Sequence, residues 1–286
     1  SEGCNHKCTF CIIPSMRGKL VSRPIGDIMQ EAENLVKSGV SELVIISQDT
    51  SAYGVDVKYR PGFWNGRPIK TDLFNLAKSL SELGVWVRFH YVYPYPNVDR
   101  LIELMASGLI LPYIDVPFQH ANPAILKSMK RPANAENNLE RINGWRTICP
   151  ELTIRSTFIV GFPGETEEDF QATMDVVRQA RFASAYTFQY SKRPGTPAAT
   201  MENQIEKEVV QERYERLVKL VNQISLEENI AQIDNSVEIL VAHGEGRKDA
   251  HTNRRSGRSA DGRLVHFDLG KHVARPGDFV TGTVLT

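Results

Sequence analysis

Three cysteines near the start of the chain carry the clearest chemical signal in this sequence. Cys4, Cys8 and Cys11 have the spacing Cys-x-x-x-Cys-x-x-Cys. Thiolates are preferred protein ligands of iron–sulfur clusters. Three of them on one loop can bind three irons of a 4Fe–4S cubane and leave the fourth iron open to S-adenosylmethionine. An electron from such a cluster can cleave the sulfonium and release a 5′-deoxyadenosyl radical.

A zinc site and a disulfide framework are the alternative interpretations of these cysteines. Zinc sites commonly combine two cysteine pairs, whereas the remaining cysteine here, Cys149, lies in a segment typical of a helix end. Disulfide frameworks belong to short, cysteine-rich secreted chains, and this chain has 4 cysteines in 286 residues. The spacing therefore favours the cluster, and a zinc-stabilised RNA-binding module is the distant alternative. Cys149 is predicted to be a small buried side chain.

The composition is that of an ordinary globular protein. Hydrophobic residues make up 41% of the chain and charged residues 24%, and 34 basic residues balance 34 acidic ones. This balance gives no overall indication of nucleic-acid or membrane binding. There is no signal peptide and no apolar run near the ~20 residues that a membrane span requires. Reduced, cluster-binding cysteines fit a reducing cytoplasm, so we expect a cytoplasmic protein that does not contact membranes.

Strand-like and helix-like segments alternate from Arg23 to about Phe188. Short apolar runs are typical of strands buried on both faces, and amphipathic stretches between Pro and Gly are typical of helices. The alternation predicts an α/β fold, in which right-handed βαβ units build a parallel sheet with helices outside. Strands are expected at 42–47, 85–93, 113–117, 152–160 and 185–190, and helices at 24–39, 71–83, 98–107, 135–148 and 165–180.

The C-terminal part of the chain changes character twice. Residues 201–234 have an apolar stripe at helical spacing, which predicts one long helix. Several short strand-like segments follow it and predict a small all-β barrel. We therefore expect a barrel domain over 1–200, a connecting helix over 201–235 and an all-β domain over 236–286.

Polar residues follow two of the predicted strands at the edge where parallel sheets bind ligands. Gln48 and Asp49 follow the first strand, and their side chains could hold the amino group or the ribose of S-adenosylmethionine. Gln119 follows 113–117 and is also predicted to contact the cofactor or the substrate. His120 beside it could line the substrate mouth, with a structural histidine as the alternative.

A glycine turn follows the strand at 152–160. Gly161 and Gly164 would let the backbone approach a cofactor closely. The next helix, with a capping pattern at Thr166 and Asp169, would face an anion such as the methionine carboxylate with its N-terminus. An ordinary strand-to-helix turn is the alternative.

The strand before this turn supplies two further candidates. Arg155 and Thr157 alternate with Thr153 and Ile159, so the four side chains should share one face. We predict that Arg155 and Thr157 contact the cofactor, with Arg155 pairing with the methionine carboxylate. A salt bridge at the rim is the alternative role for Arg155.

Several motifs together resemble the radical-SAM methylthiotransferases. They are SEGCNHKCTFCIIPSMRG, SQDTSAYG, HYVYPYPNVD, PFQHAN, MKRP and RSTFIVGFPGETEEDF. Over roughly residues 1–181 they resemble the branch that methylthiolates an aspartate of ribosomal protein S-twelve. The resemblance implies a partial (β/α) barrel followed by a TRAM-like β-domain that docks the substrate. It implies Cys4, Cys8 and Cys11 as cluster ligands and a flavodoxin-type electron donor.

Two features depart from that branch. Its members carry an N-terminal domain whose cysteines bind a second 4Fe–4S cluster, the site of sulfur transfer. This sequence begins almost at the first cluster ligand, so we expect it to cleave S-adenosylmethionine without completing thiolation unaided. From about Phe188 onward, FQYSKRPGTPAAT and GEGRKDAHTNRRSGRSADGRLVHF resemble the branch that modifies isopentenyladenosine beside the tRNA anticodon.

The arginine-rich C-terminal segment bears on the choice of substrate. Between Arg247 and Arg263, 6 basic residues stand against 2 acidic ones. Such a segment favours contact with phosphate, although a solvated loop would have the same composition. Because chemistry takes place at the mouth of the barrel, we expect ribosomal protein S-twelve as the substrate, with the tRNA anticodon stem–loop as the alternative.

Overall fold

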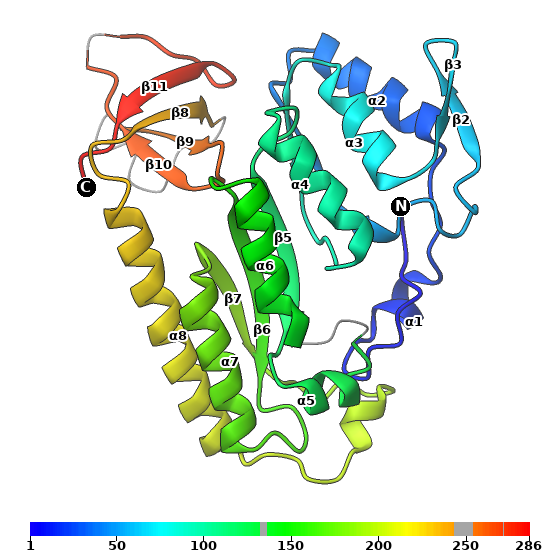
Figure 1. Cartoon of the computed structure of the whole chain (residues 1–286), viewed down its shortest axis with the longest axis vertical. Coiled ribbons are helices and arrows are strands. Elements are labelled where there is room, and N and C mark those ends of the chain that lie inside the picture. The colour runs from blue at the N-terminus through cyan, green and yellow to red at the C-terminus, as the bar shows by residue number, and fades with distance from the viewer. Residues whose placement is uncertain (132–135, 243–253, 271) are drawn as a thin grey trace.

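Five parallel strands form the centre of the molecule in the computed structural model, which describes residues 1–131, 136–242, 254–270 and 272–286 (Figure 1). Their order in the sheet is β1-β4-β5-β6-β7. The strands are β1 (Glu42–Ile45), β4 (Trp86–Phe89), β5 (Tyr113–Gln119), β6 (Thr153–Val160) and β7 (Ser184–Gln189). Because β1 and β7 do not pair with each other, the sheet is an open, partial barrel. This confirms the predicted fold.

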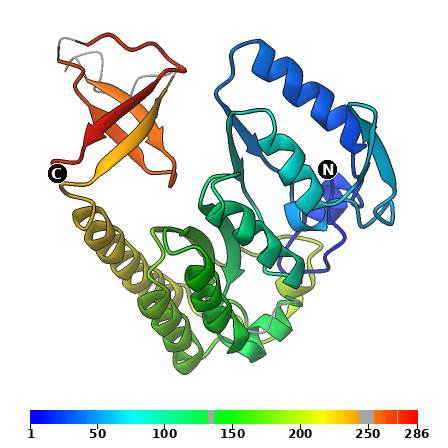
Figure 2. The ribbon, with the colours of Figure 1, turned by 45° about the horizontal axis from the view of Figure 1, so that its top comes forward.

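Helices between the strands cover one side of the curved sheet (Figures 1 and 2). They are α2 (Ile25–Lys37), α3 (Leu73–Ser81), α4 (Asp99–Ala106), α6 (Glu136–Ile148) and α7 (Glu167–Ala180). The main core lies between these helices and the sheet, with Phe89, Ile114 and Phe158 fully buried. Each element lies within a few residues of its predicted position.

Residues on β6 alternate between this core and the opposite, concave face of the sheet. Ile154, Ser156, Phe158 and Val160 are buried, and the residues between them are half-buried. Arg155 and Thr157 therefore share the concave face, as the period of two predicted.

Short elements that the sequence did not predict interrupt the alternation. The hairpin of β2 (Pro61–Trp64) and β3 (Arg67–Lys70) contacts α2. Its turn, Asn65-Gly66, has positive φ at both residues, which is typical of a tight hairpin. Two short helices, α1 (Ile13–Arg17) and α5 (Pro123–Ser128), lie near the cysteine segment.

The predicted long helix is present but shorter than expected. Helix α8 (Lys207–Ile230) begins later than Met201, after a 3-10 turn at Pro197–Thr200 and a non-helical segment over 201–206. The Gln204 side chain donates hydrogen bonds to the carbonyls of Ala198 and Met201 and holds this segment out of the helix. The helix then packs along β7 and α7.

A separate antiparallel sheet follows α8. Its strands are β8 (Ser236–Val241), β9 (Arg255–Ser259), β10 (Leu264–Phe267) and β11 (Phe279–Thr283), in the order β10-β9-β8-β11.

This C-terminal sheet contacts the end of the parallel sheet where the strands begin. Trp86 and Phe279 pack edge to face with ring centroids 4.8 Å apart. Arg88 donates hydrogen bonds to the carbonyls of Ser259 and Ala260. The Ser41 hydroxyl donates to the carbonyl of Gly277. The C-terminal sheet therefore lies at the opposite end of the strands from the predicted cofactor site.

Within the described ranges, none of the helices combines the length and apolar character that crossing a lipid bilayer requires.

Candidate cofactor site at the cysteine loop

The cysteine loop, residues 4–11, lies at the end of the parallel sheet where the strands finish. Cys4 and Cys8 are buried, Cys11 is half-buried, and all three thiols are free. The Cys11 N–H donates to the carbonyl of Cys8, and the Cys4 N–H donates to that of Gly18. Burial raises the pKa of the Cys4 and Cys11 thiols, so a metal must displace a proton from each thiol that it binds.

Thr9 fastens the middle of the loop to two distant parts of the chain. Its N–H donates to the carbonyl of Met129 at 3.0 Å, and its hydroxyl donates to that of Ser128 at 2.9 Å. The Ala198 N–H in turn donates to the Thr9 carbonyl. Because Thr9 stands between Cys8 and Cys11, these bonds fix the backbone that carries two of the thiols.

His6 fastens the first half of the loop to the ends of β1 and β4. Its Nε2 lies 2.7 Å from Asp49 Oδ2 and 3.1 Å from the Tyr95 hydroxyl. Its ring stacks on Tyr93 with centroids 4.5 Å apart and planes 9° apart. The Asp49 Oδ1 atom accepts hydrogen bonds from the Ser51 hydroxyl and the Ala52 N–H.

Asp49 therefore acts on the loop rather than standing free. Both of its carboxylate oxygens already have partners, and its side chain is 2% exposed. The predicted contact with the amino group or ribose of the cofactor would have to compete with these bonds. In this structure the residue positions His6.

Arg131 approaches the loop from the segment after α5. Its Nη1 lies 3.8 Å from Cys8 Sγ, and its Nη2 donates to the carbonyl of Pro117 at 2.5 Å. Its guanidinium carbon lies 4.1 Å from the centre of the Tyr93 ring. Tyr93 thus contacts both His6 and Arg131.

Two glutamines at the same rim carry buried polar atoms without partners among the described residues. Gln48 Oε1 and Gln119 Oε1 make no hydrogen bond. Gln119 also has φ +73°, a left-handed conformation that is costly for a residue other than glycine. Buried acceptors of this kind need a donor, so both predicted positions are suited to a polar ligand.

Arg155 lies deeper on the concave face and already has an anionic partner. Its Nη2 is 2.8 Å from Asp115 Oδ2 and 2.7 Å from His90 Nδ1. Its guanidinium also lies over the Tyr186 ring at 4.9 Å. The ion pair that was the alternative role is present, and the carboxylate of the cofactor remains a predicted partner of Arg155.

The glycine turn serves packing rather than an open anion site. A Cβ on Gly161 would lie 2.5 Å from a methyl of Val210 on α8. The Gly161 N–H donates to Glu165 Oε2, and the Gly164 N–H donates to the carbonyl of Asn203. Neither N–H is left for a carboxylate, although both glycines have positive φ as expected of this turn.

The N-terminus of α7, where the sequence predicts an anion site, already carries acidic side chains. Thr166 and Asp169 form the predicted capping box, in which each side chain bonds the other residue's N–H. Glu167, Glu168 and Asp169 fill the first turn with negative charge. These carboxylates make a further anion unfavourable there, and the contact between this helix end and the methionine carboxylate stays a prediction.

His120 is a structural residue in this arrangement. It is 1% exposed; its Nδ1 accepts the N–H of Asn122, and its Nε2 faces Glu165 Oε2 at 3.3 Å. Glu165 also pairs with Arg213 of α8 at 2.9 Å. Cys149 is fully buried, as predicted.

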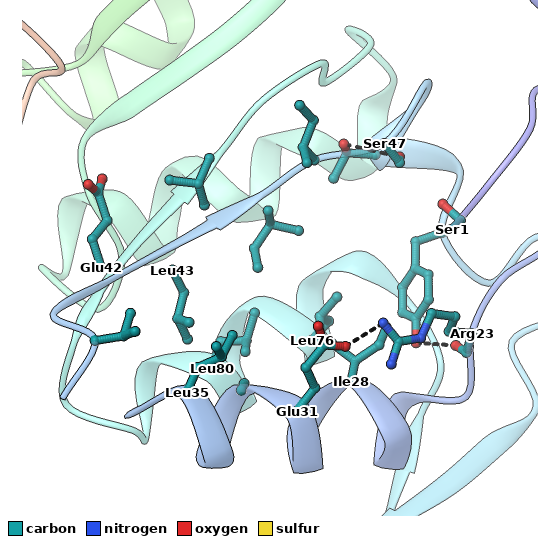
Figure 3. Close-up of a pocket in the computed structure, with 17 residues that line it drawn as sticks. Ser1, Arg23, Ile28, Glu31, Leu35, Glu42, Leu43, Ser47, Leu76 and Leu80 are labelled. Atoms are coloured by element: carbon teal, nitrogen blue, oxygen red, sulfur yellow. Dashed lines mark hydrogen bonds and ion pairs between the residues drawn. The ribbon is translucent and has the colours of Figure 1, made fainter. Parts of the chain in front are cut away.

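A cavity of ≈ 340 Å³ lies between β1 and helices α2 and α3 (Figure 3). Its wall is mainly apolar, with Leu35, Leu43 and Leu80 around it and Arg23 pairing with Glu31 at one end. It contains no cysteine or histidine. The cysteines and the other residues predicted to take part in the chemistry thus lie outside this cavity.

Comparison with protein families gives a match to the Radical SAM superfamily over residues 1–177. These residues run from the cysteine loop through β6 and most of α7, which is more than half of the chain. The chain belongs to the radical SAM superfamily.

This radical SAM chain is similar to several curated proteins named ribosomal protein uS12 methylthiotransferase RimO. The protein from Methylobacillus flagellatus is 54% identical over 285 residues, which are 100% of this chain and 64% of that protein. The one from Azoarcus sp. is 56% identical over 280 residues, covering 98% and 63%. The one from Pseudomonas fluorescens is 61% identical over 242 residues, covering 84% and 54%. The chain thus spans less than two thirds of these relatives.

Two solved structures share the fold at low sequence identity. Coproporphyrinogen III oxidase HemN from Escherichia coli has a TM-score of 0.54 and 16% identity, covering 78% of this chain and 51% of that one. SuiB from Streptococcus suis, bound to its precursor peptide SuiA, has a TM-score of 0.50 and 13% identity, covering 78% and 45%.

The superfamily implies a 4Fe–4S cluster and S-adenosylmethionine, and the residues present fit both. No three His, Cys, Asp or Glu side chains in the described ranges converge as they would around a single metal ion. A cubane is larger and takes one thiolate at each of three irons, which suits three free thiols spread along one loop. The buried acceptors of Gln48 and Gln119 suit the polar cosubstrate.

Sequence reasoning did not predict how the residues that brace the loop meet. His6, Tyr93 and Arg131 lie far apart in the chain and meet only in the fold. The signals were present, because His6 stands between two cysteines and Arg131 lies in the quoted motif MKRP. Neither signal predicts which residue His6 or Arg131 contacts.

Proposed function

We propose that this chain is the radical SAM part of a methylthiotransferase that modifies ribosomal protein uS12. The observation that carries the radical chemistry is the loop of three free thiols braced at the carboxyl ends of the strands. The choice of substrate rests on the relatives, which are named uS12 methylthiotransferases and match at 54–61% identity. Because the chain spans only part of those relatives, transfer of the methylthio group is proposed for the whole protein.

The proposed roles divide between the loop and the rim. Cys4, Cys8 and Cys11 hold the cluster, and His6 and Thr9 keep their backbone in place. When bound, the cluster supplies the electron that cleaves S-adenosylmethionine, and the resulting radical removes a hydrogen atom from the substrate.

The rim and the concave face hold the cosubstrate. Gln48 and Gln119 offer unpaired acceptors to its amino group or ribose hydroxyls. Thr157 and Arg155 lie on the concave face below them, where Arg155 could share its guanidinium between Asp115 and an incoming carboxylate. Gly161 and Gly164 shape the turn that ends β6 and so place this wall of the site.

The remaining parts of the proposal concern the surroundings of the site. We propose a barrel domain over 1–200, a connecting helix over 201–235 and a TRAM-like domain over 236–286 that docks the substrate. A flavodoxin-type protein is the proposed electron donor, the cytoplasm the proposed location, and a second 4Fe–4S cluster the proposed site of sulfur transfer in the whole protein.

A tRNA substrate has less support. The arginine-rich segment includes Arg247 and Lys248, which lie outside the described residues, while Arg263 pairs with Asp261. Relatives that match over 285 and 280 residues, C-terminal sheet included, bear the uS12 name. This favours the protein substrate over isopentenyladenosine.

The experiment is anaerobic reconstitution with iron and sulfide, followed by addition of reductant and S-adenosylmethionine. The chain should release 5′-deoxyadenosine, and Cys8→Ala should abolish both this product and the cluster absorption. Cys149→Ala, which removes the thiol outside the loop, is the matched control and should retain both. Release of 5′-deoxyadenosine by Cys8→Ala would contradict the proposal.

The substrate is tested separately with the full-length protein. Given uS12 and a tRNA anticodon stem–loop in the same reaction, it should add a methylthio group to uS12. Modification of the tRNA alone would replace the proposed substrate and leave the radical chemistry in place.

A further inference from the structure

Three arginines are buried among the residues that the structure describes: Arg88, Arg131 and Arg213. A buried guanidinium is costly unless an anion compensates its charge. Glu42 compensates Arg88 at 2.6 Å, and Glu165 compensates Arg213 at 2.9 Å.

Arg131 has no such carboxylate within the described side chains. Its surroundings otherwise resemble those of Arg88. Each guanidinium lies over a tyrosine ring, Tyr93 at 4.1 Å for Arg131 and Tyr113 at 4.9 Å for Arg88. Arg131 also donates to one main-chain carbonyl oxygen and Arg88 to two. Where Arg88 has a carboxylate oxygen, Arg131 has the sulfur of Cys8.

The comparison indicates what would compensate the charge of Arg131. A cluster bound at the cysteine loop would place anionic sulfur beside this guanidinium, as Glu42 places a carboxylate beside Arg88. The distance of 3.8 Å between Nη1 and Sγ fits an N–H···S hydrogen bond. The buried arginine therefore indicates an anionic occupant of the cysteine loop.

We propose that Arg131 is a positioning residue for the cluster. Its guanidinium donates a hydrogen bond to the Cys8 thiolate and raises the cluster's reduction potential. This inference rests on the proposed function. Net charge and hydrogen bonds to sulfur are among the features that set iron–sulfur potentials. Reduction adds one negative charge to the cluster, so a buried cation beside it stabilises the reduced form more than the oxidised form.

The Tyr93 ring connects Arg131 to the cysteine loop through contacts with both Arg131 and His6. The guanidinium carbon of Arg131 lies 4.1 Å from the centre of this ring, and the His6 ring stacks on it with the two planes 9° apart. Because His6 belongs to the cysteine loop, the guanidinium and the thiol are held in one packed unit. A change at Tyr93 should therefore act on the potential through the orientation of Arg131.

The test is a potentiometric titration of the reconstituted full chain without S-adenosylmethionine, with dithionite as reductant and electron paramagnetic resonance to measure the reduced cluster. Arg131→Gln removes the charge and keeps an amide donor. The expected result is a tenfold or larger shift of the one-electron equilibrium toward the oxidised cluster, a potential lower by about 59 mV or more. Arg131→Lys, which keeps the charge, should shift it less.

Arg88→Gln is the matched control. It removes a buried arginine that also lies over a tyrosine, but at the other end of the sheet and paired with Glu42. The reduction potential of the cluster in Arg88→Gln should equal that in the wild type. A shift as large as that of Arg131→Gln would show a general effect of lost stability and would overturn the proposal.

The outcomes separate this inference from the proposed function. A wild-type chain that takes up no iron and sulfide overturns both. A loaded, folded Arg131→Gln with an unchanged potential overturns the role of Arg131 alone. If Arg131→Gln does not fold, Tyr93→Leu decides, because it keeps the guanidinium and removes the ring that orients it. A lower potential supports the proposal, and an unchanged one overturns it.

Discussion

His6 Nε2 lies 2.7 Å from Asp49 Oδ2, which joins the cysteine loop directly to the segment after β1. The two residues are 43 positions apart in the sequence. The cysteine loop is therefore held by the folded sheet as well as by its own turns. This contact gives the first of the following predictions.

Replacing Asp49 with Asn should loosen the cysteine loop. The substitution keeps the shape of the side chain but removes the charge that His6 faces, and a hydrogen bond to a charged group contributes roughly 1.5–3 kcal/mol. We expect the reconstituted cluster to be lost several-fold faster when a chelator is added. Asp56→Asn is the control, because Asp56 accepts the N–H of Ser22 and is exposed. Equal rates of cluster loss in the two variants would contradict the role of Asp49.

Replacing Arg155 with Gln should leave Asp115 buried without its cation. Breaking a buried pair costs roughly 3–5 kcal/mol, and Arg155 is partly exposed, so the lower end is expected. Urea unfolding at neutral pH measures the loss. Arg178→Gln, which breaks an exposed ion pair with Asp175, should cost far less.

The same pair predicts a change in acid stability. Burial acts to raise the pKa of Asp115, but hydrogen bonds from His90 and Arg155 outweigh it and hold this pKa below its usual 3.8. A lowered carboxyl pKa stabilises the fold above the usual pKa, and this contribution is lost as the pH falls through the lowered value. Arg155→Gln removes the lowering effect of the guanidinium, so the pKa of Asp115 should rise and unfolding on acidification should begin at a higher pH. An unchanged acid transition would show that Arg155 does not set the charge of Asp115.

Alanine at Gly161 should cost more stability than alanine at Gly164. Both residues have positive φ, at +75° and +83°, but only a Cβ on Gly161 would clash with Val210. The strained backbone costs about 1–2 kcal/mol in each variant, and overpacking adds about 1–3 kcal/mol at Gly161 alone. Thermal unfolding measures the difference, and Val210→Ala should recover part of it. Equal losses would contradict the contact with α8.

Replacing Phe279 with Ala should weaken the attachment of the C-terminal sheet. Its edge-to-face contact with Trp86 joins β11 to β4, and such pairs contribute about 0.5–1.5 kcal/mol beyond area burial. We expect a change in tryptophan fluorescence and faster proteolysis between α8 and β8. Val273→Ala, at a side chain 89% exposed, should change neither.

The parallel sheet could be predicted from the sequence because its strands are short apolar runs between helix signals. The hairpin at 61–70 was missed because Pro61, Gly62 and Pro68 disfavour strands, although Asn65-Gly66 is a good turn signal. The edge of the sheet at which the cysteine loop lies also followed from the topology.

The partners of the site residues did not follow from the sequence. Position at the rim predicts which residues lie near the cofactor, but not that Asp49 pairs with His6 or that Gly161 packs on Val210. Arg131 and Cys8 are 123 positions apart, and no local pattern reports such a contact. Only the folded structure shows that a buried cation faces the cysteine loop.

The most direct test of a cluster with one open iron is the electron paramagnetic resonance spectrum of the reduced, reconstituted chain before and after addition of S-adenosylmethionine. We predict about four irons and four sulfides per chain and a spectrum that changes when the cosubstrate binds the open iron. A spectrum unchanged by saturating S-adenosylmethionine, or a cluster retained in Cys8→Ala, would contradict this account.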